Sequence, residues 1–282
     1  MSVRNEYGKL HSILLCKPEH FVLQPINVIA EEFIRQGALP RREKLLGEHQ
    51  EFAQAFVDAG VEVLWAEPDP HMPFQVFTRD IGVTTPFGVL LGTFREAVRQ
   101  GEEARAEAAL EGHVPVWRRI EAAPGIAFEG GDYMYVDEGR VALGIGARTT
   151  QGGAERIRAL EDELGIEVIP VRFEPRFLHL DMIFNVVGHR VCVICPDALP
   201  DDFLRQVERW RFETIEVPQE GVFRLNCNLV ALDEGVVLSP ARNKEVNTQL
   251  KALGFEVIEV GLDDLLKGGG GPHCMGFPIK RE

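Results

Sequence analysis

The sequence predicts an α/β protein in which one structural unit recurs five times. Pairs of short apolar segments are separated by turn residues, an amphipathic helix ending at glycine follows, and a β-branched segment completes the unit. The period is roughly 40 to 55 residues. Five such units, with no polar cap at either end, indicate one closed, pseudo-symmetric domain over residues 1–282 rather than an open solenoid.

The third unit shows the pattern best. Residues 133–136 form an apolar strand, a turn follows, and residues 141–144 form a second strand. The next helix carries apolar side chains on one face and ends at Gly165, because glycine tolerates the left-handed conformation that closes helices. Residues 166–169 then read as a short strand, so the unit has the order ββαβ.

The other units follow the same order with different regularity. The fourth unit has strands at 182–187, 190–194 and 214–217, and the fifth has strands at 229–232, 236–238 and 255–258. The first two units are less regular, and only their closing strands, 61–64 and 114–117, are clear. We see no linker between them that would divide the chain into two domains.

Composition limits the partners of the chain. Its formal net charge is −14, whereas nucleic-acid binding needs clustered Lys and Arg, so we expect no nucleic acid and favour a small cationic ligand. No run approaches ~18 apolar residues, and the N-terminal residues do not resemble a signal peptide, so we expect no membrane segment. The five cysteines lie mostly in apolar segments that resemble strands, and this fits reduced thiols in the cytoplasm.

Polar residues gather at the same place in successive units, where strands begin or end. These seams are residues 77–80, 128–132, 178–181 and 226–228, and Cys274 follows the fifth unit. Strand ends fix side chains while loops give access, and equivalent positions meet if the units surround a common axis. The sequence therefore predicts one site that holds a thiol, a histidine and at least three carboxylates.

This set of residue types has a chemical interpretation. Cys274 follows four glycines, residues 268–271, which allow the backbone to approach other groups closely, and a thiolate is a nucleophile. His179 can transfer protons, and Glu129 can hold its imidazole. Asp80 and Asp181 would face a cation, and a planar guanidinium is the bidentate partner of a carboxylate.

Four ordered motifs then make the chain resemble the guanidine-modifying superfamily of arginine deiminases, dimethylarginine dimethylaminohydrolases and amidinotransferases. The motifs are residues 77–80 (FTRD), 129–132 (EGGD), 179–181 (HLD) and the glycine-rich segment at Cys274. The resemblance covers almost the whole chain and implies a five-bladed α/β propeller, the pentein fold. It also implies a small guanidinium substrate and no cofactor or metal.

The resemblance further implies a covalent mechanism. Cys274 attacks the guanidinium carbon, His179 protonates the departing amine, and water activated by His179 hydrolyses the thiouronium intermediate, with Glu129 supporting the histidine. Asp80 and Asp181 match guanidinium-binding carboxylates of the family. Arg148 and Arg95 fall near positions that bind an amino-acid carboxylate.

Different features of the sequence point to different members of the superfamily. The length resembles dimethylarginine hydrolases, whereas Asp181 and the Pro272–Met275 segment resemble arginine deiminases. We therefore expect an arginine deiminase-like hydrolase that forms citrulline and ammonia. Dimethylarginine hydrolysis, conversion of arginine through to ornithine, amidinotransfer and a catalytically silent guanidinium-binding protein stay open, as does a homodimer.

Simpler interpretations exist for several residues. Asp80 and Asp181 would be surface ion-pair partners of Arg79 or Arg176, and Asp132 would be structural. Cys192 and Cys195 have the spacing of a redox motif, but they lie in an apolar strand, so we predict core packing for both. His273 would either tune the thiol or fill the loop.

Overall fold

The computed structural model describes residues 3–282, and its strands form five three-stranded sheets. In each sheet the middle strand pairs antiparallel with one neighbour and parallel with the other. The parallel partner always comes after a helical crossover, as a parallel pair requires. The predicted α/β class and the five repeated units are confirmed.

The third unit contains β6 (Tyr133–Asp137), β7 (Arg140–Ile145) and β8 (Glu167–Arg172). The crossover holds α4 (Gln151–Arg158) and α5 (Glu161–Leu164). Thr150 caps α4 by accepting the backbone N–H of Gly153, and Gly165 ends α5 with φ +66°. These bounds agree with the predicted strands to within a few residues.

The next two units have the same order of two strands, a crossover helix and a third strand, and the fifth unit begins with an additional short helix. The fourth contains β9 (Phe184–Gly188), β10 (Val191–Ile194), α6 (Asp201–Arg209) and β11 (Glu213–Glu216). The fifth contains α7 (Gln219–Val222), β12 (Val230–Asp233), β13 (Val236–Pro240), α8 (Lys244–Ala252) and β14 (Glu256–Val260). Phe203 and Val207 give α6 a buried apolar face, as the predicted period requires.

The second unit contains β3 (Gly82–Thr85), β4 (Gly88–Leu91), α3 (Glu102–Leu110) and β5 (Val116–Arg119). The first unit joins both ends of the chain, because β1 (Leu10–Cys16) pairs with β2 (Glu62–Ala66) and with the C-terminal β15 (Phe277–Arg281). The crossover from β1 to β2 holds α1 (Val28–Arg35) and α2 (Arg42–Asp58). Cys274 directly precedes β15 and so occupies the seam of the first unit.

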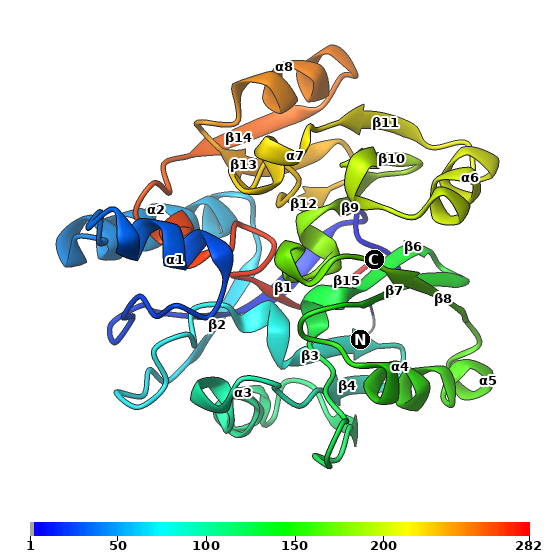
Figure 1. Cartoon of the computed structure of the whole chain (residues 1–282), viewed down its shortest axis with the longest axis horizontal. Helices are drawn as coiled ribbons and strands as arrows, with labels where there is room; N and C mark the ends of the chain where they lie inside the picture. The colour runs from blue at the N-terminus through cyan, green and yellow to red at the C-terminus, as the bar shows by residue number, and fades with distance from the viewer. Residues whose placement is uncertain (1–2) are drawn as a thin grey trace.

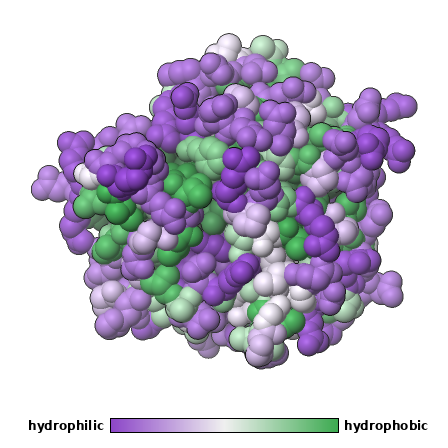
Figure 2. Space-filling view, in the orientation of Figure 1, coloured by the Kyte–Doolittle hydropathy of each residue, from purple (hydrophilic) through white to green (hydrophobic). Residues whose placement is uncertain are grey.

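Most of the helices lie around the outside of the sheets (Figure 1). In that view α8 lies at the top, α6 on the right, α4 and α5 below it, α3 at the lower left and α1 and α2 on the left. Hydrophilic side chains cover most of this face, while hydrophobic ones gather beside α1 (Figure 2). Within residues 3–282, no helix combines the length and apolar character needed to span a membrane.

Candidate active site

The predicted seams are brought together by short turns that precede the first strand of a unit. Three of them are single 3₁₀ turns, namely Thr78–Ile81, Gly130–Asp132 and Leu180–Met182. The middle turn contacts both of the others. Asp80, Asp132 and Asp181 lie in these turns and are buried. The seams therefore converge, as the repeat predicts.

Cys274 lies at this convergence and is buried. Its Sγ donates to Oδ2 of Asp181 at 3.3 Å and accepts from Nδ2 of Asn228 at 3.1 Å. Burial and the charges of Asp181 and Asp80 raise the pKa of the Cys274 thiol well above its usual range. The thiol is therefore protonated at neutral pH, before any cation enters the site.

The four glycines before Cys274 lie against other parts of the site. A Cβ at Gly270 would come within 2.5 Å of the Phe77 ring and 3.0 Å of Cβ of Cys274, and a Cβ at Gly271 within 2.7 Å of Asn228. Gly269 has φ +91°, which side chains rarely adopt. The prediction that this run permits a close backbone approach is confirmed.

His179 is buried between two carboxylates. Its Nε2 lies 3.0 Å from Oε2 of Glu129, and its Nδ1 lies 3.6 Å from Oδ1 of Asp80. Burial alone would lower the pKa of His179, but Asp80, Glu129 and Asp132 outweigh it and raise that pKa to about 9. His179 is therefore a cation at neutral pH, with Nδ1 free of hydrogen bonds within residues 3–282.

Glu129 is the buried partner that orients this imidazole. Its Oε1 accepts the backbone N–H of Arg95 at 3.2 Å, and its Oε2 lies 3.7 Å from Nη1 of Arg148. Burial would raise the pKa of Glu129, but His179 and Arg148 lower it to about 2. The carboxylate therefore stays ionised and fixes the proton on Nε2 of His179.

Asp80 has a partner that the sequence did not indicate. Arg99 lies in a 3₁₀ turn, Ala97–Arg99, and its Nη1 donates to Oδ2 of Asp80, while its Nη2 donates to Oε2 of Glu102 at 2.8 Å. All three side chains are buried, so the alternative that Asp80 forms a surface pair with Arg79 is wrong. Oδ1 of Asp80 makes no hydrogen bond within the described residues.

Asp181 contacts both the thiol of Cys274 and a histidine through the same carboxylate oxygen, Oδ2. Its Oδ2 lies 2.9 Å from Nδ1 of His273, whose Nε2 lies 3.7 Å from Oε2 of Glu6. Burial would raise the pKa of Asp181, but His273 lowers it. Asp181 is fully buried, so the surface-pair alternative with Arg176 is also wrong.

The two arginines predicted to bind a carboxylate differ in position. Arg148 is buried, lines the cavity beside Cys274, and donates from Nη2 to the carbonyl oxygen of Ile26 at 2.8 Å. Arg95 is exposed and donates from Nη1 to the carbonyl oxygen of Ala147 at 2.7 Å. Arg99, four residues later, lines the cavity in its place.

Asp132 accepts hydrogen bonds from backbone N–H groups and does not line the cavity. Its Oδ1 accepts the N–H of Leu180 at 2.9 Å, and its Oδ2 accepts the N–H of Thr149 at 3.1 Å. These bonds join the segments that carry His179 and Arg148, which supports the structural interpretation. Burial raises the pKa of Asp132 to about 6.

The cavity at this convergence is small, about 20 Å³, which is room for about one water molecule. Six polar side chains line it, namely Asn27, Asp80, Arg99, Arg148, His179 and Cys274. The segment before α1 also lines it, and Nδ2 of Asn27 donates there to the carbonyl oxygen of Gly268 at 3.0 Å.

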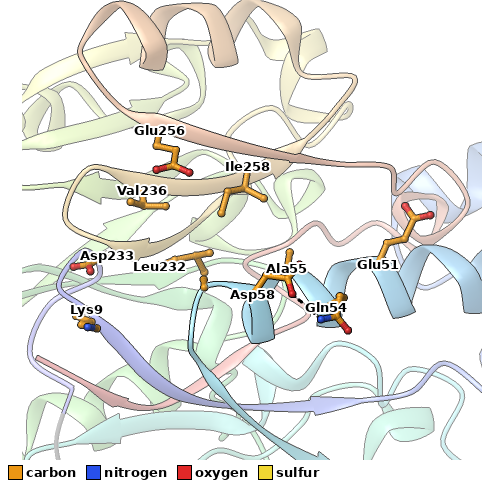
Figure 3. Close-up of a pocket in the computed structure, with 11 residues that line it drawn as sticks. Lys9, Glu51, Gln54, Ala55, Asp58, Leu232, Asp233, Val236, Glu256 and Ile258 are labelled. Atoms are coloured by element: carbon orange, nitrogen blue, oxygen red, sulfur yellow. Dashed lines mark hydrogen bonds between the residues drawn. The ribbon is translucent and has the colours of Figure 1, made fainter.

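A second groove, a possible metal-ligand set and the Cys192–Cys195 pair complete the candidate sites. A groove of about 530 Å³ lies between α2 and the sheet of β12–β14, and acidic side chains including Glu51 and Glu256 line it (Figure 3). Asp80, Glu129 and His179 offer donor atoms within 4.8 Å of one another, but the nearby Arg99 and Arg148 disfavour a bound metal cation. Cys192 and Cys195 are buried in the hydrophobic core, as predicted.

Comparison with known protein families shows to which family the chain belongs. The family described as N,N dimethylarginine dimethylhydrolase, eukaryotic, matches residues 17–281. The chain belongs to this family. The predicted guanidine-modifying superfamily is therefore confirmed, and the chain is a member of a superfamily of enzymes.

Several relatives of this dimethylarginine dimethylhydrolase family member are similar in sequence. An uncharacterised Bacillus subtilis protein, YkgA, is 31% identical over 99% of this chain and 94% of its own length. Arginine deiminase of Rhodococcus opacus is 30% identical over 76% of this chain. The chain spans 61% of that deiminase and 63% of the Bacillus cytotoxicus deiminase.

Solved structures of two kinds resemble the fold. The N-terminal domain of ArgZ, an arginine dihydrolase of cyanobacteria solved with bound product, has a TM-score of 0.84 and 26% identity, covering 97% of this chain and 98% of that chain. Dimethylarginine dimethylaminohydrolase of Pseudomonas aeruginosa, solved with citrulline, has a TM-score of 0.78 and 25% identity, covering 95% and 99%. Both chains match this one nearly from end to end.

Proposed function

We propose that this protein is a cysteine-dependent hydrolase that cleaves a C–N bond of arginine or a close derivative and forms citrulline and ammonia. The observation that carries the proposal is the convergence of Cys274, His179 and Asp80 on one small cavity, with Glu129 in contact with His179 and Asp181 in contact with Cys274. A thiol, a cationic imidazole and carboxylates are what covalent attack on a guanidinium requires.

The proposed reaction begins with attack on the guanidinium. Sγ of Cys274 bonds to the guanidinium carbon while the thiol proton passes to Oδ2 of Asp181, 3.3 Å away. One nitrogen then leaves as ammonia with the proton from Nδ1 of His179, giving the thiouronium. Water attacks the same carbon after losing a proton to Nδ1. The C–S bond then breaks as the new hydroxyl group releases its proton to solvent, Sγ takes back the proton held by Asp181, and citrulline leaves.

The charges of the site match an amino acid with a guanidinium head. Within the described residues, Oδ1 of Asp80 makes no hydrogen bond and can accept the guanidinium N–H groups, while Oδ2 is paired with Arg99. Arg148 supplies the buried positive charge for the substrate carboxylate, whereas Arg99 is paired with Asp80 and Glu102 and holds Asp80 in place.

We also infer that the five sheets are the blades of an α/β propeller whose axis passes through the site, and that residues 1–282 form one catalytic domain. Each unit contributes the turn before its first strand, and β15 joins the last turn to the first unit. This arrangement explains how residues from distant parts of the chain meet.

Two further reactions are supported by specific observations. The family match favours dimethylarginine hydrolysis to citrulline and dimethylamine. The similarity to ArgZ over nearly the whole of both chains favours continued hydrolysis of arginine to ornithine. Arginine deimination is preferred because each methyl group replaces an N–H that Asp80 would accept.

A substrate panel tests the function. We expect arginine to exceed dimethylarginine in kcat/KM by about tenfold or more, because a dimethylated nitrogen leaves a buried carboxylate unpaired. Citrulline, ornithine, ammonia and dimethylamine should be measured after incubation with arginine, monomethylarginine, dimethylarginine and agmatine. Cys274→Ala is the control, and no turnover of any guanidine would leave only a binding protein.

Replacing Gly131 by alanine is expected to lower kcat/KM by about 10- to 100-fold. A Cβ there would lie 2.9 Å from Oδ1 of Asp80 and from the His179 ring, so it would push these groups apart. Gly139→Ala is the matched control, because its Cβ would meet nothing nearer than 3.8 Å. Equal activity of the two folded variants, measured by citrulline formation, would contradict the geometry.

A further inference from the structure

Asn228 is the residue that the fifth unit places at the seam. It lies in the turn before β12 and is fully buried. The other four units place Cys274, Asp80, Glu129 and His179 at equivalent turns. Asn228 therefore completes the ring of seams, although its side chain is neither a nucleophile nor an acid.

Hydrogen bonds fix which end of the Asn228 amide faces the sulfur. Its Oδ1 accepts the backbone N–H groups of His273 at 3.0 Å and of Cys274 at 3.3 Å. A backbone N–H only donates, so the oxygen has to point toward these two residues. Nδ2 then points toward Sγ of Cys274, 3.1 Å away, and the carbonyl oxygen of Asp181, 3.4 Å away.

The Asn228 amide opposes the other charges around the sulfur. The carboxylate of Asp181 and the burial of the site both disfavour a thiolate. Within residues 3–282, the N–H of Asn228 is the one side-chain donor that makes a hydrogen bond to Sγ. A donor at this place stabilises negative charge on sulfur both when the C–S bond forms and when it breaks.

We propose that Asn228 is a positioning residue that holds Sγ of Cys274 and donates a hydrogen bond to it as charge develops on the sulfur. The proposal rests on the proposed function of Cys274 as the nucleophile. Its two acceptor bonds lock the backbone of residues 273 and 274, and its donor bond sets the direction of the thiol. One side chain therefore both positions the sulfur and stabilises its negative charge.

Asn228→Asp tests this role most sharply. The aspartate keeps an oxygen for the two backbone N–H groups but replaces the donor by an anionic oxygen. We expect the pKa of the Cys274 thiol to rise by about one unit or more and kcat to fall about tenfold or more, with a smaller change in KM. The thiol pKa is measured from the pH dependence of iodoacetamide alkylation, with Cys274 identified by peptide mass spectrometry.

Asn226→Asp is the matched control, because it adds the same charge two residues away without a hydrogen bond to Sγ. An unchanged thiol pKa in folded Asn228→Asp would overturn the proposal. If that variant does not fold, Asn228→Ala is measured in the same way, with the same rise expected and the same contradiction. Alkylation needs no guanidine turnover, so its result is separate from failure of the proposed function, which the substrate panel would show.

Discussion

Replacement of Cys274 by serine is expected to lower the turnover of arginine by at least about 10³-fold. Serine is nearly isosteric with cysteine, and Sγ makes its hydrogen bonds with Asn228 and Asp181, which a hydroxyl can keep. The hydroxyl is a far weaker nucleophile at neutral pH and a poorer leaving group from the intermediate. Citrulline formation under saturating arginine measures the loss.

A buried thiol outside the site provides the control for this substitution. Cys192 lies in β10 within the hydrophobic core, so Cys192→Ser should keep turnover within about twofold while lowering the free energy of unfolding by about 1–3 kcal/mol. Thermal unfolding of both variants separates stability from chemistry. Retention of most activity by Cys274→Ser would exclude covalent catalysis by this residue.

Replacement of His179 by alanine is expected to lower turnover by about 10²- to 10⁴-fold, because protonation of the leaving nitrogen and activation of water both use this imidazole. In the unsubstituted protein, kcat/KM should fall as pH rises through about 9, the pKa of His179. The proton held on His179 also stabilises the fold. That stabilisation is complete below the unfolded pKa of about 6.5 and is lost as pH rises through about 9.

Glu129→Gln is the companion variant for the pH measurement. Burial lowers the pKa of His179, and Glu129 is one of the carboxylates that raises it, so removal of this charge should lower it. We expect the alkaline limb of the kcat/KM profile to move to lower pH by about one unit or more. An alkaline limb at the same pH in Glu129→Gln would assign it to another group.

The repeat made much of the fold predictable. In the third unit, strands expected at 133–136, 141–144 and 166–169 correspond to β6, β7 and β8, because local apolar patterns and a closing glycine encode them. β15 was not predicted, because it is a strand only through its pairing with β1 at the other end of the chain. The crossover with α1 and α2 is also longer than those of the other units, which made the first unit less regular in the sequence, although its closing strand was predicted.

The candidate site was predictable where residues lie in seams and not where they reach across units. Cys274, His179, Glu129 and Asp80 were found because the repeat places them in register. Arg99 was missed because it follows a loop with no periodicity, and the nearby Arg95 was chosen in its place.

Two other contacts depend on pairs of segments far apart in the chain. Glu6 meets His273, and Asn228 meets Cys274, and neither contact has a local pattern. The signal for Asn228 was present all the same, because residues 226–228 occupy the seam of the fifth unit.

The central claim is a covalent bond between Cys274 and the guanidinium carbon, and acid quenching during turnover of arginine tests it most directly. The Cys274 peptide is expected to gain the mass of arginine minus ammonia, and the gain should vanish as arginine is exhausted. Gain of a bare amidino group would indicate amidinotransfer. A Cys274 peptide that stays unmodified at every quench time while citrulline accumulates would contradict the account.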